Sequence, residues 1–151
     1  MILRPLAAAV LAMALAACAE RSDDLGPPTL HYGQDVCDIC SMIISEDRFS
    51  SAIALRRDGR VEYLLFDDAG EMLAAPAPQA DELRWWVHDA DTREWIDGRT
   101  AIYLVSESLM TPMGTGVAAY ATRAAAEEAR ITWPGKLMDF PTVRESLSAG
   151  P

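Results

Sequence analysis

Several motifs that define enzyme classes are missing from this chain. It has no glycine-rich phosphate loop, no Gly-x-Ser-x-Gly motif and no His-Glu-x-x-His motif. These absences argue against phosphate-loop nucleotide binding, serine hydrolysis and zinc proteolysis. Basic residues are also scarce, because 13 Lys and Arg face 23 Asp and Glu, for a formal net charge of −10 at pH 7. Nucleic-acid phosphates are bound by Lys and Arg, so we expect no nucleic-acid partner.

Histidine and cysteine are few, with two His and three Cys in the whole chain. A zinc ribbon needs a second Cys or His pair beside its first one. The only histidines, His31 and His88, lie far apart in the sequence and do not form such a pair. The pattern therefore argues against a four-ligand zinc ribbon built on the pair Cys37 and Cys40.

The amino terminus lacks an apolar run long enough to span a bilayer comfortably. Residues 1–17 hold one basic residue, Arg4, before a Leu- and Ala-rich run, which is typical of a secretory signal peptide. Residues 15–18, Leu-Ala-Ala-Cys, resemble the lipobox of bacterial lipoproteins. That resemblance implies cleavage before Cys18, lipidation of Cys18 and a periplasm-facing anchor. Ala19 is not an inner-membrane retention signal of the Asp type, so the anchor is compatible with either the inner or the outer membrane.

The segment after the anchor divides into a tether and a domain. Residues 18–35 are mostly polar and include Gly-Pro-Pro at 26–28, which predicts a flexible tether. Residues 36–151 suit one compact domain.

Three sulfur side chains, Cys37, Cys40 and Met42, fall within six residues. Soft thiolate and thioether donors favour Cu(I), whereas zinc rarely uses methionine. A redox dithiol would need a lowered thiolate pKa and usually a strand-to-helix setting, but this segment precedes the first predicted strand. A structural disulfide is compatible with an oxidising compartment. Copper binding, redox chemistry and a disulfide therefore all remain open at this point.

Further candidate ligands are distant in the sequence. Met110 and Met113 lie in a loop with Pro and Gly, where core packing does not readily explain two methionines. His88 ends an aromatic-rich segment, and imidazole is a good copper ligand. Asp67 and Asp68 precede a predicted helix, where a cap is the favoured interpretation and a ligand for a harder second ion is the alternative.

Strand and turn patterns predict two similar halves. The first half has expected strands at 50–55, 61–66 and 83–88 and an expected helix at 69–75. The second half has expected strands at 100–106, 117–121 and 137–140 and a helix at 123–130, followed by a last helix at 141–147. Each half is ββαβ, with units at about 36–92 and 93–147. We expect an α+β domain of antiparallel sheets with helices on one face.

Taken together and in order, these motifs resemble the NosL family of copper-binding lipoproteins, which serve nitrous-oxide reductase assembly. The motifs are the lipobox, Cys-x-x-Cys-x-Met at 37–42, Phe-Asp-Asp at 66–68, Val-His-Asp at 87–89, Ala-Ile-Tyr-Leu-Val at 101–105 and Thr-Pro-Met-Gly at 111–114. The resemblance implies a Cu(I) metallochaperone rather than an enzyme. It also implies two ββαβ units, similar to organomercurial lyase. The implied partners are the reductase apoprotein and an ABC-type membrane complex.

The resemblance also implies a set of metal ligands. Cys40 and Met42 match the cysteine–methionine pair of the family most directly, and Met110 and Met113 match its Thr-Pro-Met-Gly loop. Cys37, Met113 or His88 would complete the copper shell. A lipid-anchored thiol–disulfide oxidoreductase that uses Cys37 and Cys40 is the alternative function. A non-catalytic envelope module with a structural disulfide is the third.

Overall fold

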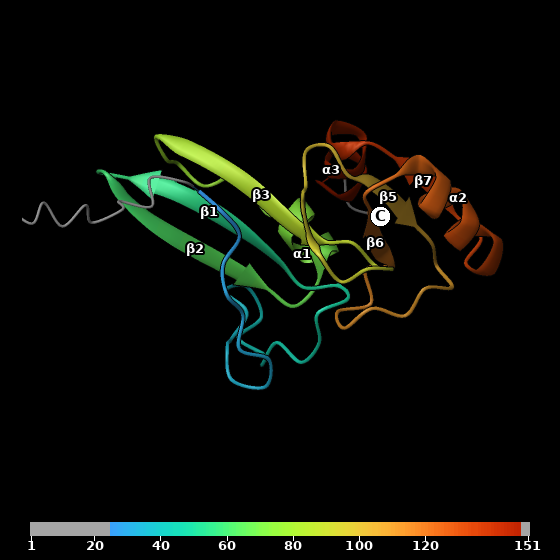
Figure 1. Cartoon of the computed structure of the whole chain (residues 1–151), viewed down its shortest axis with the longest axis horizontal. Coiled ribbons are helices and arrows are strands. Elements are labelled where there is room, and N and C mark those ends of the chain that lie inside the picture. The colour runs from blue at the N-terminus through green and yellow to red at the C-terminus, as the bar shows by residue number, and fades with distance from the viewer. Residues whose placement is uncertain (1–24, 149–151) are drawn as a thin grey trace, which may run out of the picture.

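The computed structural model describes residues 25–148. The predicted signal peptide, the lipidation site Cys18 and residues 18–24 of the predicted tether lie outside the described residues. Figure 1 shows the chain as two neighbouring parts, each built on one sheet. The elements are β1 (Ser51–Arg57), β2 (Arg60–Phe66), α1 (Ala69–Ala74), β3 (Glu82–His88), β4 (Trp95–Asp97), β5 (Ile102–Val105), β6 (Val117–Tyr120), α2 (Arg123–Thr132), β7 (Lys136–Met138) and α3 (Phe140–Ser148).

The two sheets have the same core topology. The first has the strand order β2-β1-β3-β4 and the second has β6-β5-β7, and every pairing within them is antiparallel. In each half the first strand is central, the second pairs on one side, and the strand after the helix pairs on the other. This arrangement confirms the predicted ββαβ repeat and the α+β fold. Asp58 and Gly59, a pair typical of hairpin turns, form the turn between β1 and β2, with φ angles of 51° and 73°.

Local sequence signals explain the ends of the helices. The Asp68 side chain accepts from Gly70 N at 2.8 Å and caps α1, while Thr122 accepts from Ala125 N at 3.2 Å and caps α2. Asp139 accepts from Thr142 N at 3.1 Å, so β7 ends before it and α3 begins. The last strand is therefore shorter than the expected 137–140.

Strand β4 corrects the predicted boundary between the halves. Its register with β3 pairs Trp86 with Asp97 and His88 with Trp95. The first sheet therefore continues to Asp97, past the boundary expected at 92/93. Three residues are too short a run to give a clear period-2 pattern, which explains why the sequence did not reveal this strand.

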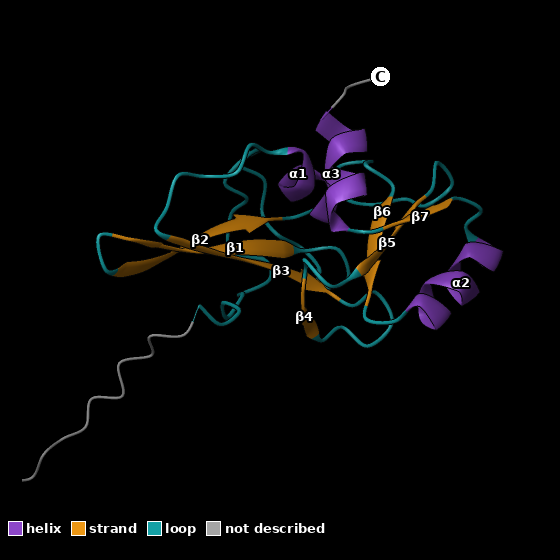
Figure 2. Ribbon diagram, turned by 90° about the horizontal axis from the view of Figure 1, so that it is seen from above, coloured by secondary structure: helices purple, strands orange, loops and turns teal. Residues whose placement is uncertain are grey.

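The prediction that helices cover one face only is wrong for the second sheet. Tyr103 and Val117 point into a core shared with α1 and α3, whereas Leu104 and Tyr120 point into a second core under α2. Alternate residues of a strand face opposite sides, so both faces of this sheet are buried. Figure 2 shows α2 on the other side of β5, β6 and β7 from α1 and α3.

Residues 25–35 correct the predicted extent of the tether. Leu25 is buried, and its carbonyl oxygen accepts from Trp86 Nε1 at 2.9 Å. Leu30 packs against the first core. Burial of these two apolar side chains is favourable, so this stretch belongs to the packed domain and not to a free linker. Among residues 25–148, no helix has the length and apolar character needed to cross a membrane.

Candidate metal centre

The Cys-x-x-Cys-x-Met segment is a closed loop attached to the edge of the first sheet. Cys37 N donates to Met42 O at 2.9 Å, and Ser41 N donates to Cys37 O at 3.0 Å. Asp38 N donates to Leu65 O at 2.8 Å, and Leu65 N donates to Asp38 Oδ2 at 2.6 Å. Because Leu65 lies on β2, an edge strand, these bonds both cover the open edge and fix the loop.

Two thiols and a carboxylate meet at this loop. Cys37 and Cys40 are both free thiols. Their sulfur atoms and a carboxylate oxygen of Glu71 all lie within 4.8 Å of one another. Cys37 is buried, with 1% of its surface exposed, while Cys40 and Glu71 are half-buried. The structure therefore brings both predicted thiols to one point, where a single metal ion could contact all three groups.

Glu71 is the member of this cluster that the sequence analysis missed. It lies in the first turn of α1, and its Oε2 accepts from Cys37 Sγ at 3.4 Å. The acidic first turn was visible in the sequence as a helix signal. Nothing in the sequence related it to cysteines more than thirty residues earlier, because the contact depends on how α1 packs beside the loop.

Burial disfavours negative charge at Cys37 and Glu71 of this cluster. Burial raises the pKa of the Cys37 thiol above its usual value. Burial also raises the pKa of Glu71, and the nearby Asp68 and Asp67 charges add to this effect. Burial raises the pKa of Asp67 as well, and the hydrogen bond that Asp67 accepts from Ser45 N offsets only part of this rise. A bound cation would offset the cost of these buried anions, so the donor set fits a metal.

Asp68 joins the helix of the first half to the methionine loop of the second half. Its fully buried carboxylate accepts from Gly70 N at 2.8 Å and from Thr115 Oγ1 at 2.5 Å through Oδ1. Through Oδ2 it accepts from Thr111 Oγ1 at 2.5 Å and from Met113 N at 3.1 Å. The prediction of a cap is confirmed for Asp68, and the same side chain holds the Thr-Pro-Met-Gly loop against α1.

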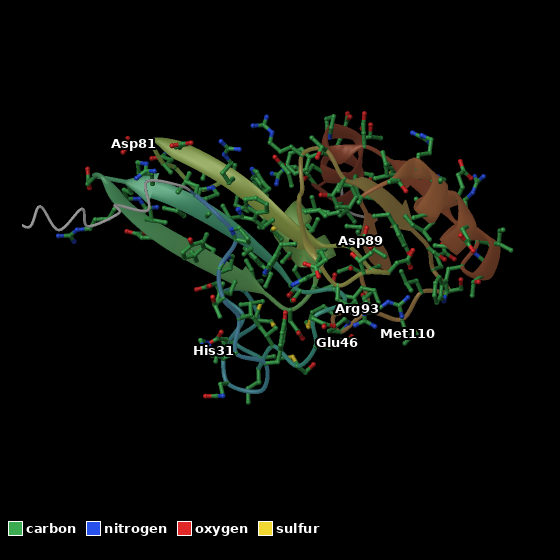
Figure 3. The ribbon with its side chains drawn as sticks, in the orientation of Figure 1. His31, Glu46, Asp81, Asp89, Arg93 and Met110 are labelled. Carbon is green, nitrogen blue, oxygen red and sulfur yellow. The ribbon has the colours of Figure 1, made fainter. Side chains whose placement is uncertain are left out.

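The predicted methionine ligands differ in their surroundings. Met42 is 52% exposed beside the thiols, and Met113 is half-buried with its backbone fixed by Asp68. Met110 is 81% exposed, and Figure 3 shows it at the surface of the second half. Met42 is therefore a solvent-exposed thioether two residues after Cys40. Met113 lies in a loop whose backbone is bound to Asp68, three residues before Glu71. Their roles as ligands stay predictions.

His88 lies in a different environment from the thiol cluster. Its Nδ1 is 3.1 Å from Ser50 Oγ and 3.2 Å from Ser50 O, and its Nε2 is 3.5 Å from Tyr32 OH. Its ring stacks on Trp95 at 3.7 Å between centroids, and burial lowers its pKa. The cluster of Cys37, Cys40 and Glu71 does not include this imidazole.

A two-sheet α+β domain with a loop-borne thiol pair and a neighbouring carboxylate defines a candidate soft-metal-binding protein. The family model for NosL matches residues 28–148, and the chain belongs to the NosL family. The family predicted from the motifs is thus confirmed.

Two relatives are similar to this chain over most of its length. Copper-binding lipoprotein NosL of Stutzerimonas stutzeri is 27% identical over 156 residues, which cover 94% of this chain and 80% of that protein. The crystal structure of the copper chaperone NosL from Shewanella denitrificans matches with a TM-score of 0.56 at 20% identity. That match covers 76% of this chain and 96% of the other chain. It confirms the fold.

Proposed function

We propose that this chain is a periplasmic, lipid-anchored metallochaperone that carries Cu(I) for the maturation of nitrous-oxide reductase. The observation that supports it most is the convergence of Cys37, Cys40 and Glu71 within 4.8 Å in a chain of the NosL family. The names of the relatives, a copper-binding lipoprotein and a copper chaperone, support the cargo. The lipobox-like residues 15–18 support an anchor at Cys18.

Copper binding would begin with the loss of thiol protons, because thiolates and not thiols bind metal. Cys37 Sγ already donates to Glu71 Oε2 at 3.4 Å, so Glu71 is placed to accept that proton. Cys37 and Cys40 would then hold the ion as thiolates. The soft sulfur set favours Cu(I) over Zn(II) or harder cations.

Transfer to an acceptor would use the open side of the cluster. Met42 is half-exposed beside Cys40, so an incoming sulfur or imidazole donor could replace the weak Met42 thioether first. The ion could then move by stepwise ligand exchange without entering free solution. The proposed acceptors are the nitrous-oxide reductase apoprotein and an ABC-type membrane complex.

The structure gives less support to a thiol–disulfide oxidoreductase. A reactive cysteine of that class has a lowered pKa, usually at the amino end of a helix. Here burial raises the pKa of Cys37, and the Cys-x-x-Cys segment is a loop that precedes β1. The geometry therefore favours metal carriage over dithiol exchange.

An anaerobic Cu(I) titration against a competing chelator tests the proposal. We expect one Cu(I) per chain, and we expect Cys40→Ser and Met42→Ala each to weaken binding. Met138→Leu is the matched control, since Met138 lies on β7, where its Sδ accepts from Ser146 Oγ, and it is not among the predicted ligands. Unchanged affinity in both Cys40→Ser and Met42→Ala would refute the site assignment.

A further inference from the structure

The loop that holds the cysteines also presents an unusual apolar surface. Eight large apolar side chains are exposed among residues 25–148, and five of them lie between residues 32 and 43. Single exposed apolar residues are ordinary, whereas a group of them indicates a contact surface. We call this group the apolar face. Its members are Tyr32, Val36, Ile39, Met42 and Ile43.

The apolar face is held in place by its backbone. Val36 and Ile43 form an antiparallel bridge, and Ile44 N donates to Asp35 O at 2.9 Å. The buried side chains of Cys37 and Ile44 anchor the same two strands of the loop in the core. Val36 and Ile43 are therefore held at the surface by the fold of the loop, because their neighbours Cys37 and Ile44 are the residues that pack into the core.

Acidic residues are frequent in the segment that carries this face. The sequence contains no Lys or Arg from residue 25 to residue 47. Within that span lie Asp35, Asp38, Glu46 and Asp47; Asp35 accepts from His31 N, Asp38 accepts from Leu65 N, and Asp47 is paired with Arg93. Figure 3 shows His31 and Glu46 on the part of the chain that extends below the first sheet. A partner surface with Lys and Arg would complement this acidic segment.

We propose that the apolar face docks a protein whose contact surface is apolar at its centre and ringed by Lys and Arg. The inference rests on the proposed function, because the predicted ligand Met42 belongs to this face, Cys40 lies two residues before it, and an acceptor must reach the ion there. Apolar contact would exclude water around the moving ion. The acidic segment would set orientation and speed association.

Kinetics of Cu(I) transfer from the loaded chain test this proposal, with the reductase apoprotein and the ABC-type complex as probes. We expect Val36→Thr/Ile43→Thr to weaken association with the accepting probe about tenfold, as expected for the loss of apolar anchors at an interface. Each single variant serves as a check if the double variant folds poorly. We expect Glu46→Lys to slow association about fivefold at low salt and less at high salt.

Matched controls come from α2, at the other end of the molecule (Figure 1). Ile131→Ser and Glu128→Lys change an exposed apolar residue and an exposed acid there, and we expect neither to alter transfer. Transfer to a small chelator, bathocuproine disulfonate, needs no docking surface. Its rate should be unchanged in Val36→Thr/Ile43→Thr.

Several results would overturn the docking proposal while the Cu(I) affinity remains intact. These are equal transfer rates in the face variants and the α2 controls, or no association of the wild-type chain with either probe. A wild-type dimer that Ile43→Thr disrupts would assign the face to a second copy instead. Binding to phosphatidylglycerol vesicles that Ile43→Thr abolishes would assign it to a membrane. If the wild-type chain does not bind Cu(I), the proposed function itself is refuted.

Discussion

Replacement of Asp68 by alanine should be among the most damaging single changes in this domain. Its carboxylate accepts four hydrogen bonds while fully buried, two from backbone amides and two from threonine hydroxyls. The hydroxyls of Thr111 and Thr115 are 3.4 Å apart and can partly satisfy each other after the change. The amides of Gly70 and Met113 cannot rotate, so they would lose their acceptor, the first in a buried and the second in a part-buried position.

The magnitude follows from those two amides. A buried donor left without a partner costs about 1–3 kcal/mol, so we expect the free energy of unfolding to fall by roughly 4 kcal/mol in Asp68→Ala. Asp68→Asn keeps one acceptor oxygen and should lose about half as much, roughly 2 kcal/mol. Thr122→Ala is the matched control, because Thr122 also caps a helix but serves only α2, and it should lose about 1 kcal/mol.

Urea denaturation of the metal-free, reduced protein, followed by tryptophan fluorescence, measures these differences. The order expected is Asp68→Ala, then Asp68→Asn, then Thr122→Ala, with the largest loss first. If Asp68→Ala costs no more than Thr122→Ala, then Asp68 acts as a simple helix cap. The link that we describe between the two halves would then be wrong.

Three further predictions concern backbone space and pH. Gly116→Ala should lower the free energy of unfolding by roughly 3 kcal/mol, because the φ angle of Gly116 is 68° and an added Cβ would lie 2.2 Å from Ser106 O. A loss below about 1 kcal/mol in urea denaturation would contradict this. The lowered pKa of His88 means that the unfolded state binds the proton more readily, so the free energy of unfolding should fall as pH drops below about 6.5. Denaturation curves at pH 7.5 and 5.5 measure this fall, and His88→Gln should make it smaller. An equal fall in His88→Gln and in the wild-type chain would contradict the prediction. The raised pKa of Cys37 favours its protonated thiol, and Cu(I) binding removes that proton, so Cu(I) affinity should rise with pH by at least about tenfold per unit. A Cu(I) affinity that does not change with pH would contradict this.

Much of the fold could be predicted because its signals are local. The Asp58-Gly59 turn and the Asp68 and Thr122 caps each act within a few residues. The repeat followed from them, since two series of the same local signals build the same topology. Strand β4 and the position of α2 could not be predicted in this way, because both depend on tertiary pairing and packing.

The candidate site was predictable in part for the same reason. Cys37 and Cys40 are close in sequence, so their meeting needs only a tight loop. Glu71 joins them through the packing of α1, and the Met113 loop reaches α1 through the buried Asp68. Such contacts between distant segments leave no spacing pattern in a single sequence. His88 is a good ligand type that lies within hydrogen-bonding distance of Ser50, and its role as a ligand stays a prediction.

X-ray absorption at the copper K-edge of the Cu(I)-loaded chain identifies the oxidation state of the ion and the atoms that bind it. We expect a reduced ion with a shell dominated by sulfur, and a loss of sulfur scattering in Cys40→Ser that Met138→Leu does not reproduce. A shell of nitrogen and oxygen donors, or a spectrum unchanged by Cys40→Ser, would contradict a copper site at Cys37 and Cys40.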